Sequence, residues 1–270
     1  GEGEMKMLLA IDIGNTNVTI GAFEGNIIQT VLRINSRPTR LVDRYGQIIK
    51  SWLDKNHFDS AAVSGVVIGS VVPRLTEPFS IVARTFFKCE ALIVSCNLDL
   101  GRRILVDNPA EVGADRLCNA VAAATNYPCP CIVVDLGTAT TFDVLDQDGN
   151  YIGGAIAPGL VTGASDLFRK AAQLYSVNLD FPQRVIGKNT SAHMQSGIMF
   201  GHLAMIEGMI KRITVGMGRT EIFTIATGGF SEVVASHTTF INAVDSNLTL
   251  NGLYLIYNLN RRNSGKAPKI

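Results

Sequence analysis

The sequence predicts an α/β protein of two similar halves, each with a mixed sheet flanked by helices. Residues 8–13 form an apolar run that ends in Asp and Ile, and Gly, Asn and Thr follow it. Residues 131–136 repeat this order, and Gly and Thr again follow the Asp. After each run come two more strand patterns and then long helical stretches. This internal duplication predicts two packed halves whose turns face each other across a cleft.

The amino-acid composition limits the classes of protein to which this chain can belong. The chain has 270 residues, of which 47% are hydrophobic and 17% charged, so a large core is expected. The net charge of +1 gives no electrostatic case for nucleic acid or for a membrane surface. The apolar stretch 61–72 is too short and too interrupted to span a bilayer. Five cysteines without a disulfide pattern favour a reducing, cytoplasmic location.

The first half is expected over residues 5–118, since Met5 or Met7 is a natural start and residues 1–4 look like an added segment. The turn Glu24-Gly25-Asn26 predicts a β-hairpin, and Pro73 suits the first position of a helix. We expect strands at 5–13, 18–23, 27–34, 62–70, 91–95 and within 100–109, and helices at 40–53, 73–87 and 111–126.

The second half is expected over residues 119–262. Asp148-Gly149-Asn150 repeats the hairpin turn of the first half, and Thr227-Gly228-Gly229 forms a third small turn before a helix. We expect strands at 131–136, 140–145, 151–156, 221–226 and 240–243, and helices at 159–175, 191–215 and 248–260. No low-complexity linker separates the halves.

The first turn, Asp12 to Asn17, carries the chemistry of a phosphate site. Gly14 lets the backbone approach a ligand, and the Asn and Thr residues supply donors. An acid beside such a turn suits Mg²⁺ and nucleotide phosphates. An ordinary hairpin turn with an Asx cap is the alternative for one such turn alone. Its repetition at Asp135 favours a binding role for both.

Asp115 is the candidate for acid–base chemistry. A carboxylate can accept a proton from an alcohol nucleophile, but an Asp at the start of a helix can also cap it or interact with its dipole. Arg116 can bind a carboxylate with its guanidinium fork, or pair with Glu111 or Asp115. We interpret Asp143, on the strand after the second turn, as a side-chain support or a neighbour of a cation, and not as a catalyst. Glycines 153, 154 and 159 either allow close approach of a ligand or simply form turns.

Other reactive residues lack a pattern that indicates a site. Cys129-Pro130-Cys131 does not have the spacing of a C-x-x-C redox or metal motif, so these cysteines are interpreted as structural. The four histidines are not grouped as metal ligands and are expected to be structural or on the surface: His57, His193, His202 and His237.

Five segments taken together resemble one family, the type III pantothenate kinases of the actin, Hsp70 and sugar-kinase ATPase superfamily. They are Asp12-Ile13-Gly14-Asn15-Thr16-Asn17, Glu111-Val112-Gly113-Ala114-Asp115-Arg116, Asp135-Leu136-Gly137-Thr138-Ala139-Thr140, Gly153-Gly154-Ala155-Ile156-Ala157-Pro158-Gly159 and Thr227-Gly228-Gly229. The resemblance implies two ribonuclease-H-like (actin-like ATPase) halves with a nucleotide cleft between them. It spans residues 7 to about 260, and the order of the segments makes it specific.

The resemblance also implies roles for individual residues. The nucleotide-binding residues would be Asp12, Ile13, Gly14, Asn15, Thr16, Asn17, Val18, Thr19 and Thr138, with Asp12 near Mg²⁺. The pantothenate-binding residues would be Gly113, Ala114, Asp115, Arg116 and Thr190, with Asp115 as the catalytic base. Asp135 would hold a monovalent cation, K⁺ or NH₄⁺.

The implied reaction is transfer of the γ-phosphoryl group of ATP to pantothenate, the first step of coenzyme A synthesis, by a homodimer. The apolar positions of 198–213 fit either a core helix or a dimer face. One residue departs from the family: Val106 precedes Asp107-Asn108-Pro109, where many members carry a substrate-contacting Tyr. The alternative to a kinase is a non-catalytic, nucleotide-binding regulator with the same fold. The presence of Asp12, Asp115 and Asp135 argues against this alternative.

Overall fold

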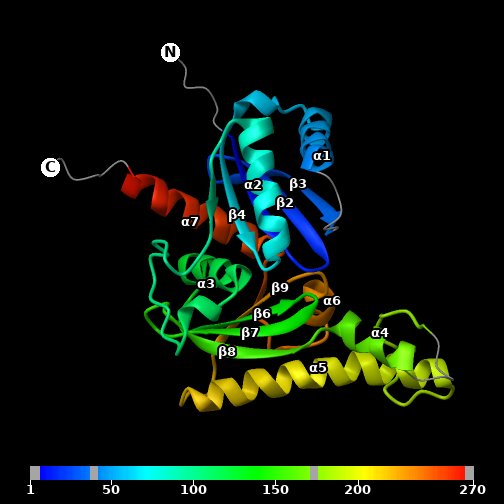
Figure 1. The fold of residues 1–270 in the computed structure, drawn as a ribbon. Coiled ribbons are helices and arrows are strands. Elements are labelled where there is room, and N and C mark those ends of the chain that lie inside the picture. Colours follow the sequence, from blue (N-terminus) through cyan, green and yellow to red (C-terminus); the bar gives the residue numbers. More distant parts are fainter. Residues whose placement is uncertain (1–6, 37–41, 171–175, 265–270) are drawn as a thin grey trace. The chain divides into compact units, whose positions relative to one another are not determined.

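The computed structural model describes residues 7–36, 42–170 and 176–264 (Figure 1). Its contacts divide the chain into two compact units, residues 1–125 with 247–270, and residues 126–246. The chain therefore passes from one unit to the other twice. This division differs from the expected halves, 5–118 and 119–262, because the last helix belongs to the first unit.

The first unit is built on a five-stranded mixed sheet in the order β3-β2-β1-β4-β5. The strands are β1 (Met7–Ile13), β2 (Asn17–Glu24), β3 (Ile27–Asn35), β4 (Val63–Ser70) and β5 (Ala91–Ile93). Strand β1 pairs antiparallel with β2 and parallel with β4. The predicted hairpin joins β2 to β3, and Gly25 in its turn has φ 59°, a value that glycine adopts without strain.

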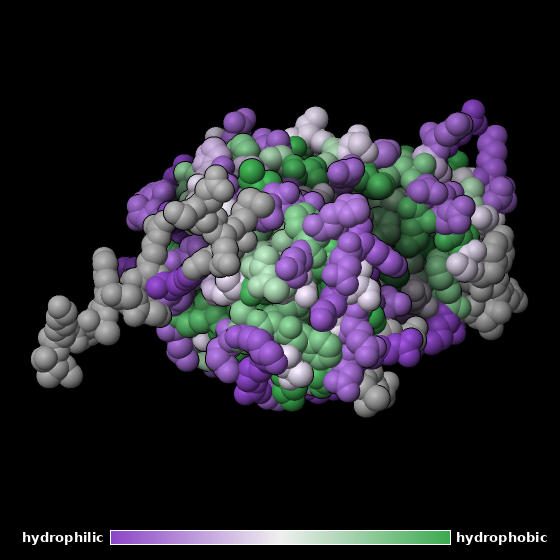
Figure 2. All heavy atoms as spheres, turned by 90° about the horizontal axis from the view of Figure 1, so that it is seen from above, coloured by the Kyte–Doolittle hydropathy of each residue, from purple (hydrophilic) through white to green (hydrophobic). Residues whose placement is uncertain are grey.

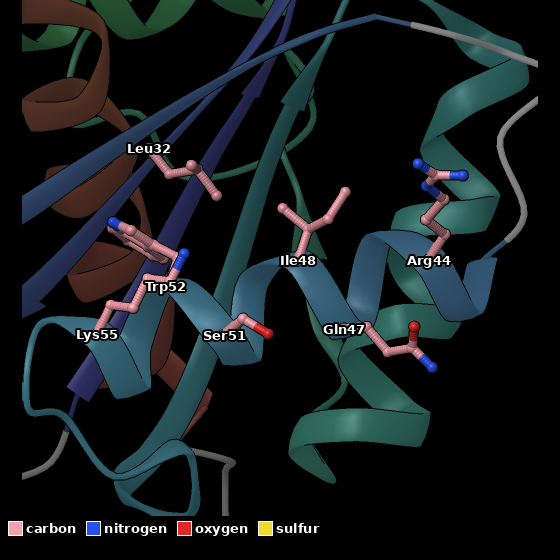
Figure 3. A pocket seen from close by; sticks show the side chains of 7 residues that line it. All are labelled: Leu32, Arg44, Gln47, Ile48, Ser51, Trp52 and Lys55. Atoms are coloured by element: carbon pink, nitrogen blue, oxygen red, sulfur yellow. The ribbon is translucent and has the colours of Figure 1, made fainter.

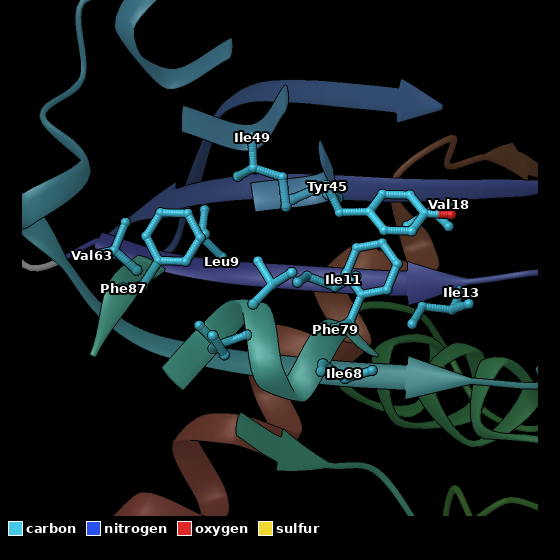
Figure 4. Close-up of a cluster of buried hydrophobic side chains, with 14 of the residues drawn as sticks. Leu9, Ile11, Ile13, Val18, Tyr45, Ile49, Val63, Ile68, Phe79 and Phe87 are labelled. Atoms are coloured by element: carbon cyan, nitrogen blue, oxygen red, sulfur yellow. The ribbon is translucent and has the colours of Figure 1, made fainter. Parts of the chain in front are cut away.

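Helices cover both faces of this sheet. Helices α1 (Val42–Lys55) and α2 (Pro73–Phe87) pack on one face, where Figure 4 shows Tyr45 of α1 and Phe79 of α2 over the side chains of β1. Their ring centroids are 4.6 Å apart. Helices α3 (Ala114–Asn126) and α7 (Leu248–Ser264) pack on the other face. Residues of β1 alternate between the two cores, with Leu9 and Ile11 in one and Leu8 and Ala10 in the other.

The second unit repeats this topology. Its sheet has the order β10-β9-β6-β7-β8, so each strand has a counterpart in the first sheet. The strands are β6 (Cys131–Leu136), β7 (Ala139–Leu145), β8 (Tyr151–Pro158), β9 (Phe223–Thr227) and β10 (Ala243–Val244). Strand β6 pairs antiparallel with β7 and parallel with β9, as β1 does with β2 and β4. The predicted duplication and fold class are confirmed.

Three helices belong to the second unit: α4 (Leu160–Lys170), α5 (Thr190–Gly216) and the short α6 (Ser231–Ala235). Helix α5 packs on the sheet through Leu203, Ile206 and Ile210, which lie in one core with Ile132 and Val134 of β6. This apolar stripe is therefore core, as one of the two readings of residues 198–213 expected.

Several expected boundaries were wrong. The helix expected over 111–126 begins at Ala114, because residues 109–111 form a separate 3₁₀ turn, η2 (Pro109–Glu111), and Gly113 interrupts the run. The strand expected within 100–109 is reduced to one bridging residue, Ile104, and the strand expected at 240–243 lies at β10 instead. Residues 5, 6, 40, 41 and 171–175 of the expected elements lie outside the described residues. A further 3₁₀ turn, η1 (Ser60–Ala62), precedes β4.

The surface is mixed in polarity. Figure 2 shows hydrophilic side chains spread over one face, with smaller hydrophobic areas between them. No helix within the described ranges is long and apolar enough to cross a membrane.

Candidate active site

The first turn lies where β1 leaves the core of the first unit. Asp12 is half-buried and pairs with Thr19 of β2 and with Gly69 of β4. It lies on the same face of the strand as Leu8 and Ala10, which is the face covered by α3 and α7. The sequence therefore folds so that the first candidate acid faces α3.

The backbone of this turn is held on both sides. The Gly14 amide donates to the Asn17 carbonyl at 2.9 Å, and the Ser36 hydroxyl donates to the Gly14 carbonyl at 2.6 Å. The Ser36 amide donates to the Thr16 carbonyl at 2.9 Å. Asn15 and Thr16 are exposed, so the tip of the turn is open to a ligand.

Not every predicted residue of this turn offers a side chain. Ile13 and Val18 are fully buried in the core under α1 and α2. They can therefore meet a ligand only through their backbone, whereas Asn17 and Thr19 are half-buried.

Asp115 lies in the first turn of α3. Its Oδ1 accepts a hydrogen bond from the Arg116 amide at 2.8 Å. A Cβ on Gly113 would lie 2.6 Å from that same Oδ1, so the absence of a side chain at Gly113 makes room for the carboxylate. Burial raises the pKa of Asp115, and the hydrogen bond and charge of Arg116 oppose that rise. Both readings of Asp115 thus have support, because it contacts a helix-start amide and also has the raised pKa of a base.

Asp12 and Asp115 lie near one another in the first unit, as Cys118 shows. This thiol is fully buried on α3, and its pKa is raised by burial first and then by the charges of Asp12 and Asp115. Ala114 is also buried, close to Gly69, the neighbour of Asp12 in the sheet. The start of α3 therefore brings Asp115 to the strand end that carries Asp12. Val106 is half-buried in the loop that precedes η2.

The second turn lies at the equivalent place in the second unit. Asp135 is half-buried and pairs with Thr141 of β7 and Thr227 of β9. The Gly137 amide donates to the Ala139 carbonyl at 3.1 Å. Thr138 is exposed, and its carbonyl accepts a hydrogen bond from the Thr162 hydroxyl at 2.6 Å.

Behind this turn lies a contact that the sequence did not predict. Thr140 is fully buried, and its hydroxyl shares a 3.0 Å hydrogen bond with Nε2 of His202 on α5. Burial lowers the pKa of His202, which favours the neutral ring. Among the four histidines, this one supports the second turn, in keeping with the expected structural role.

The third turn packs tightly against the second, beside Asp135. Gly228 has φ 89°, and a Cβ there would lie 2.7 Å from Asp135 Oδ1 and from both the carbon and the oxygen of the Leu136 carbonyl. The two turns therefore meet so closely that a side chain at Gly228 would clash. The Ser231 hydroxyl donates to the Gly228 carbonyl at 2.7 Å and fixes the turn. Carboxylate and carbonyl oxygens are ligands for hard cations.

Thr190 begins α5 and is exposed. The preceding Asn189 caps the helix, since its Oδ1 accepts a hydrogen bond from the Ala192 amide at 2.9 Å. The hydroxyl of Thr190 is thus presented at a fixed helix end in the second unit.

A surface pocket of about 470 Å³ lies elsewhere, between β3 and α1. Figure 3 shows its apolar side chains, Leu32, Ile48 and Trp52, with Arg44 and Lys55 toward the two ends of α1. This pocket contains no predicted site residue and lies on the face of the sheet opposite α3. It is not part of the candidate active site.

Within the described residues, no group of three His, Cys, Asp or Glu side chains is placed to hold a metal ion. None of the five cysteines, which all lie in the described ranges, forms a disulfide, and the sulfurs of Cys129 and Cys131 are 3.9 Å apart.

Comparison with known proteins decides the family. The family model described as type III pantothenate kinase matches residues 8–212. This chain belongs to the type III pantothenate kinase family. A type III pantothenate kinase of Roseiflexus sp. (strain RS-1) is 46% identical over 94% of this chain and 100% of its own length. One from Dehalococcoides mccartyi is 41% identical over 94% of this chain and 96% of its own length.

Solved structures agree with the fold of this pantothenate kinase family member. A Campylobacter jejuni protein described as a Baf family transcriptional activator has a TM-score of 0.60 at 18% identity, covering 94% of this chain and 99% of its own. A Listeria monocytogenes protein described as an N-acetylmannosamine kinase has a TM-score of 0.52 at 12% identity, covering 95% and 99%. At these identities the likeness shows the sugar-kinase type of fold alone.

Proposed function

We propose that this chain transfers the γ-phosphoryl group of ATP to the hydroxyl of pantothenate, the first step of coenzyme A synthesis. Membership of the type III pantothenate kinase family over most of the chain supports the reaction. The observation that carries the mechanism is the half-buried carboxylate of Asp115, which has a raised pKa and lies at the strand end of Asp12.

In this reaction the hydroxyl oxygen of pantothenate attacks the γ-phosphorus. The bond between that phosphorus and the bridging oxygen of ADP breaks, so that 4′-phosphopantothenate and ADP form. Asp115 accepts the hydroxyl proton as the new bond forms. A carboxylate whose pKa is raised by burial holds that proton better than an exposed one, which suits a general base. Phosphoryl transfer otherwise depends on positioning and charge neutralisation.

The first turn is proposed to bind the phosphates of ATP. Asn15 and Thr16 are exposed at the tip of the turn, where a phosphate could approach them, and Asp12 is the proposed carboxylate for Mg²⁺. Mg²⁺ is commonly held by one or two carboxylates together with substrate phosphates and water. A lone strand-end carboxylate fits that pattern better than a cage of several protein ligands. When bound, Mg²⁺ neutralises phosphate charge.

The second turn is proposed to hold a monovalent cation, K⁺ or NH₄⁺. The half-buried carboxylate of Asp135 lies at the second turn beside Gly228, and an oxygen ligand of this kind suits such a cation. When bound, the cation would supply fixed positive charge at this turn. The exposed hydroxyl of Thr138 is proposed as an ATP contact.

The pantothenate site is proposed around the start of α3. The guanidinium of Arg116 suits the carboxylate of pantothenate, and Gly113 allows close approach. Ala114 is buried, so its contribution is through the backbone. The exposed hydroxyl of Thr190 is a further proposed contact. Val106, which is half-buried, is proposed to offer an apolar contact at the position where the resemblance implies a Tyr.

We also propose a cytoplasmic homodimer. Large apolar side chains of the second unit are exposed on β8, on α4 and on the segment before α5, namely Ile156, Val161, Leu167, Val185 and Ile186. Exposed apolar area of this kind favours association. Sedimentation velocity on the purified chain tests it, and a species with the mass of one chain at micromolar concentration contradicts it.

The reaction is tested by incubating the purified chain with pantothenate, ATP, Mg²⁺ and K⁺ and measuring 4′-phosphopantothenate by mass spectrometry. Asp115→Asn should lower kcat at least about 10²-fold, because the base is lost. Asp54→Asn is the matched control, since Asp54 is exposed on α1 on the opposite face of the same sheet. Nucleotide binding without any pantothenate turnover by the wild type would overturn the proposal and favour a regulator.

A further inference from the structure

Helix α3 carries the proposed base, and its first turns touch two glycines from distant parts of the chain. One is Gly69 on β4, and the other is Gly252 on α7. Both contacts involve Cys118, which is one helical turn beyond Asp115 and on the same side of the helix. Figure 1 shows α7 lying along the sheet on the side away from α2, and Cys118 belongs to the core on that side.

Side chains of α3 and α7 pack over Gly69 of β4. A Cβ on Gly69 would lie 3.7 Å from Cys118 Sγ, 3.7 Å from Ala114 Cβ and 3.1 Å from Leu253 Cδ2. The α3 side chains therefore reach the surface of β4 at the residue paired with Asp12. The start of α3 therefore lies beside the strand end that carries Asp12, with its side chains at ordinary van der Waals distance from Gly69.

The contact with Gly252 sets the position of α3 from the opposite side. A Cβ there would lie 2.5 Å from the carbonyl carbon of Cys118 and 2.7 Å from its Cα. Real Cβ atoms do not come this close to backbone, so the two helices meet main chain to main chain. One residue further on, Asn119 Oδ1 accepts a 2.8 Å hydrogen bond from the Thr249 hydroxyl, which also ties α3 to α7.

We propose that Gly252 and Cys118 are positioning residues for Asp115, holding α3 between α7 and Gly69 so that the carboxylate lies at the Asp12 strand end. The inference rests on the proposed function, because it assigns these residues through the role of Asp115. Neither residue needs to touch substrate. Their effect is to fix the backbone one turn from the base, and a shift of about 1 Å there is enough to impair catalysis.

The test substitutes Gly252→Ala and compares it with Gly46→Ala. Gly46 lies on α1, on the other face of the same sheet, where a Cβ would lie 2.5 Å from Phe86 Cζ. A phenyl ring can move aside, whereas the backbone of Cys118 cannot move without moving α3. Both variants add one methyl group to a crowded helix of the first unit. They differ in the group that must move to make room, which is the backbone of Cys118 for Gly252→Ala and the ring of Phe86 for Gly46→Ala.

Gly252→Ala is expected to lower kcat about 10²-fold, with the KM for ATP changed much less. The acid limb of its kcat–pH profile should move to lower pH, because a displaced α3 leaves Asp115 more exposed. The ionisable groups around Asp115 on this face are Arg116 and Cys118 of α3 and Asp12 of β1, and residues 248–256 of α7 carry no charge. Gly46→Ala should keep the wild-type kcat and pH profile, even where its melting temperature falls.

Cys118→Ala keeps the test decisive if Gly252→Ala does not fold, since it removes one buried atom and adds none. Cys118→Ala should also lower kcat, by a smaller factor than Gly252→Ala, and it should also move the acid limb of the kcat–pH profile to lower pH. Wild-type kinetics in Cys118→Ala, or equal losses in Gly252→Ala and Gly46→Ala, would overturn the inference. An inactive wild type would instead refute the proposed function, so the two failures are distinguishable.

Discussion

The turn between β1 and β2 and the turn between β6 and β7 follow equivalent strands of the two sheets, but they differ in length and in hydrogen bonding. Asp12 pairs with Thr19 and Asp135 pairs with Thr141, so the acid faces a threonine across the hairpin in both units. Three residues separate β1 from β2, but only two separate β6 from β7. The glycine amide correspondingly donates three residues ahead in the first turn and two residues ahead in the second.

The larger difference lies in what packs beside each acid. The parallel neighbour of Asp12 is Gly69, over which Ala114 and Cys118 of α3 pack. The parallel neighbour of Asp135 is Thr227, and the next residue, Gly228, packs against the Leu136 carbonyl and Asp135. The two acids thus stand in similar frames but have different neighbours, and we propose different roles for them, beside a base in the first unit and at a cation in the second.

The largest effect should come from the first acid. Asp12→Asn removes the proposed Mg²⁺ carboxylate and should lower kcat by about 10²–10³-fold, as loss of a charge-stabilising group does. Initial rates over a range of Mg²⁺ concentrations check it, and the half-saturating Mg²⁺ concentration should rise. If Asp12→Asn retains the wild-type dependence of the rate on Mg²⁺ concentration, Asp12 does not bind Mg²⁺ and the proposed role of the first turn is wrong.

A smaller effect should come from the second acid. Asp135→Asn should reduce activity in K⁺ about tenfold, because a bound charge is lost while the base and the Mg²⁺ ligand remain. Rates in K⁺, NH₄⁺ and Na⁺ should become alike in this variant, whereas the wild type should be slower in Na⁺. A wild type equally active in Na⁺ would remove the cation role, and a loss greater than that of Asp12→Asn would reverse the comparison.

The close packing beside Asp135 can be disturbed directly. Gly228→Ala adds a Cβ against Asp135 Oδ1 and the Leu136 carbonyl, and it also strains a residue with φ 89°. Unfolding free energy should fall by about 1–3 kcal/mol, and activation by K⁺ should be lost. Gly25→Ala is the matched control, because Gly25 also has positive φ but a Cβ there meets nothing within 4 Å. It should lose stability and keep its response to K⁺.

The smallest effect concerns stability and pH. Burial raises the pKa of Asp115 in the folded chain above its value of about 3.9 in an unfolded chain. The folded state therefore binds the proton more tightly, and stability from this group is present at low pH and lost as pH rises through the folded pKa. Asp115→Asn should melt about 1–3 °C higher than wild type at pH 7.

That gain should shrink as the pH falls toward 4, which thermal melts at several pH values would reveal. Asp54→Asn serves again as the control and should show no such trend. A gain in Asp115→Asn that does not change with pH would contradict burial of the carboxylate as its cause.

Sequence patterns predicted those structural elements that are determined by residues close together in the chain. The strand–turn–strand units, the hairpin at Gly25 and the helix opened by Pro73 were confirmed, because each is set by residues close together in the chain. The element boundaries around residues 100–113 were predicted wrongly, because a loop containing Pro and Gly has no regular spacing of apolar residues from which an element could be predicted. The last helix was predicted as an element, but nothing local indicates that it packs in the first unit.

The candidate site divides in the same way. Asp12, Asp115 and Asp135 stand in recognisable segments, and their roles stay predictions. Their supports were not foreseen, among them Ser36 under the first turn and His202 behind the second. Single serines, histidines and glycines in ordinary helices and loops carry no local signal, because their partners lie tens of residues away.

The return of α7 to the first unit has a consequence for the order of synthesis. The second unit is one uninterrupted stretch and can begin to fold on the ribosome before translation ends. The first unit must wait, because Leu250, Leu253 and Ile256 of its core are made late. A nascent chain therefore holds the sheet that bears Asp12 with one face covered only by α3 until α7 emerges, and that interval is when a chaperone has most to protect.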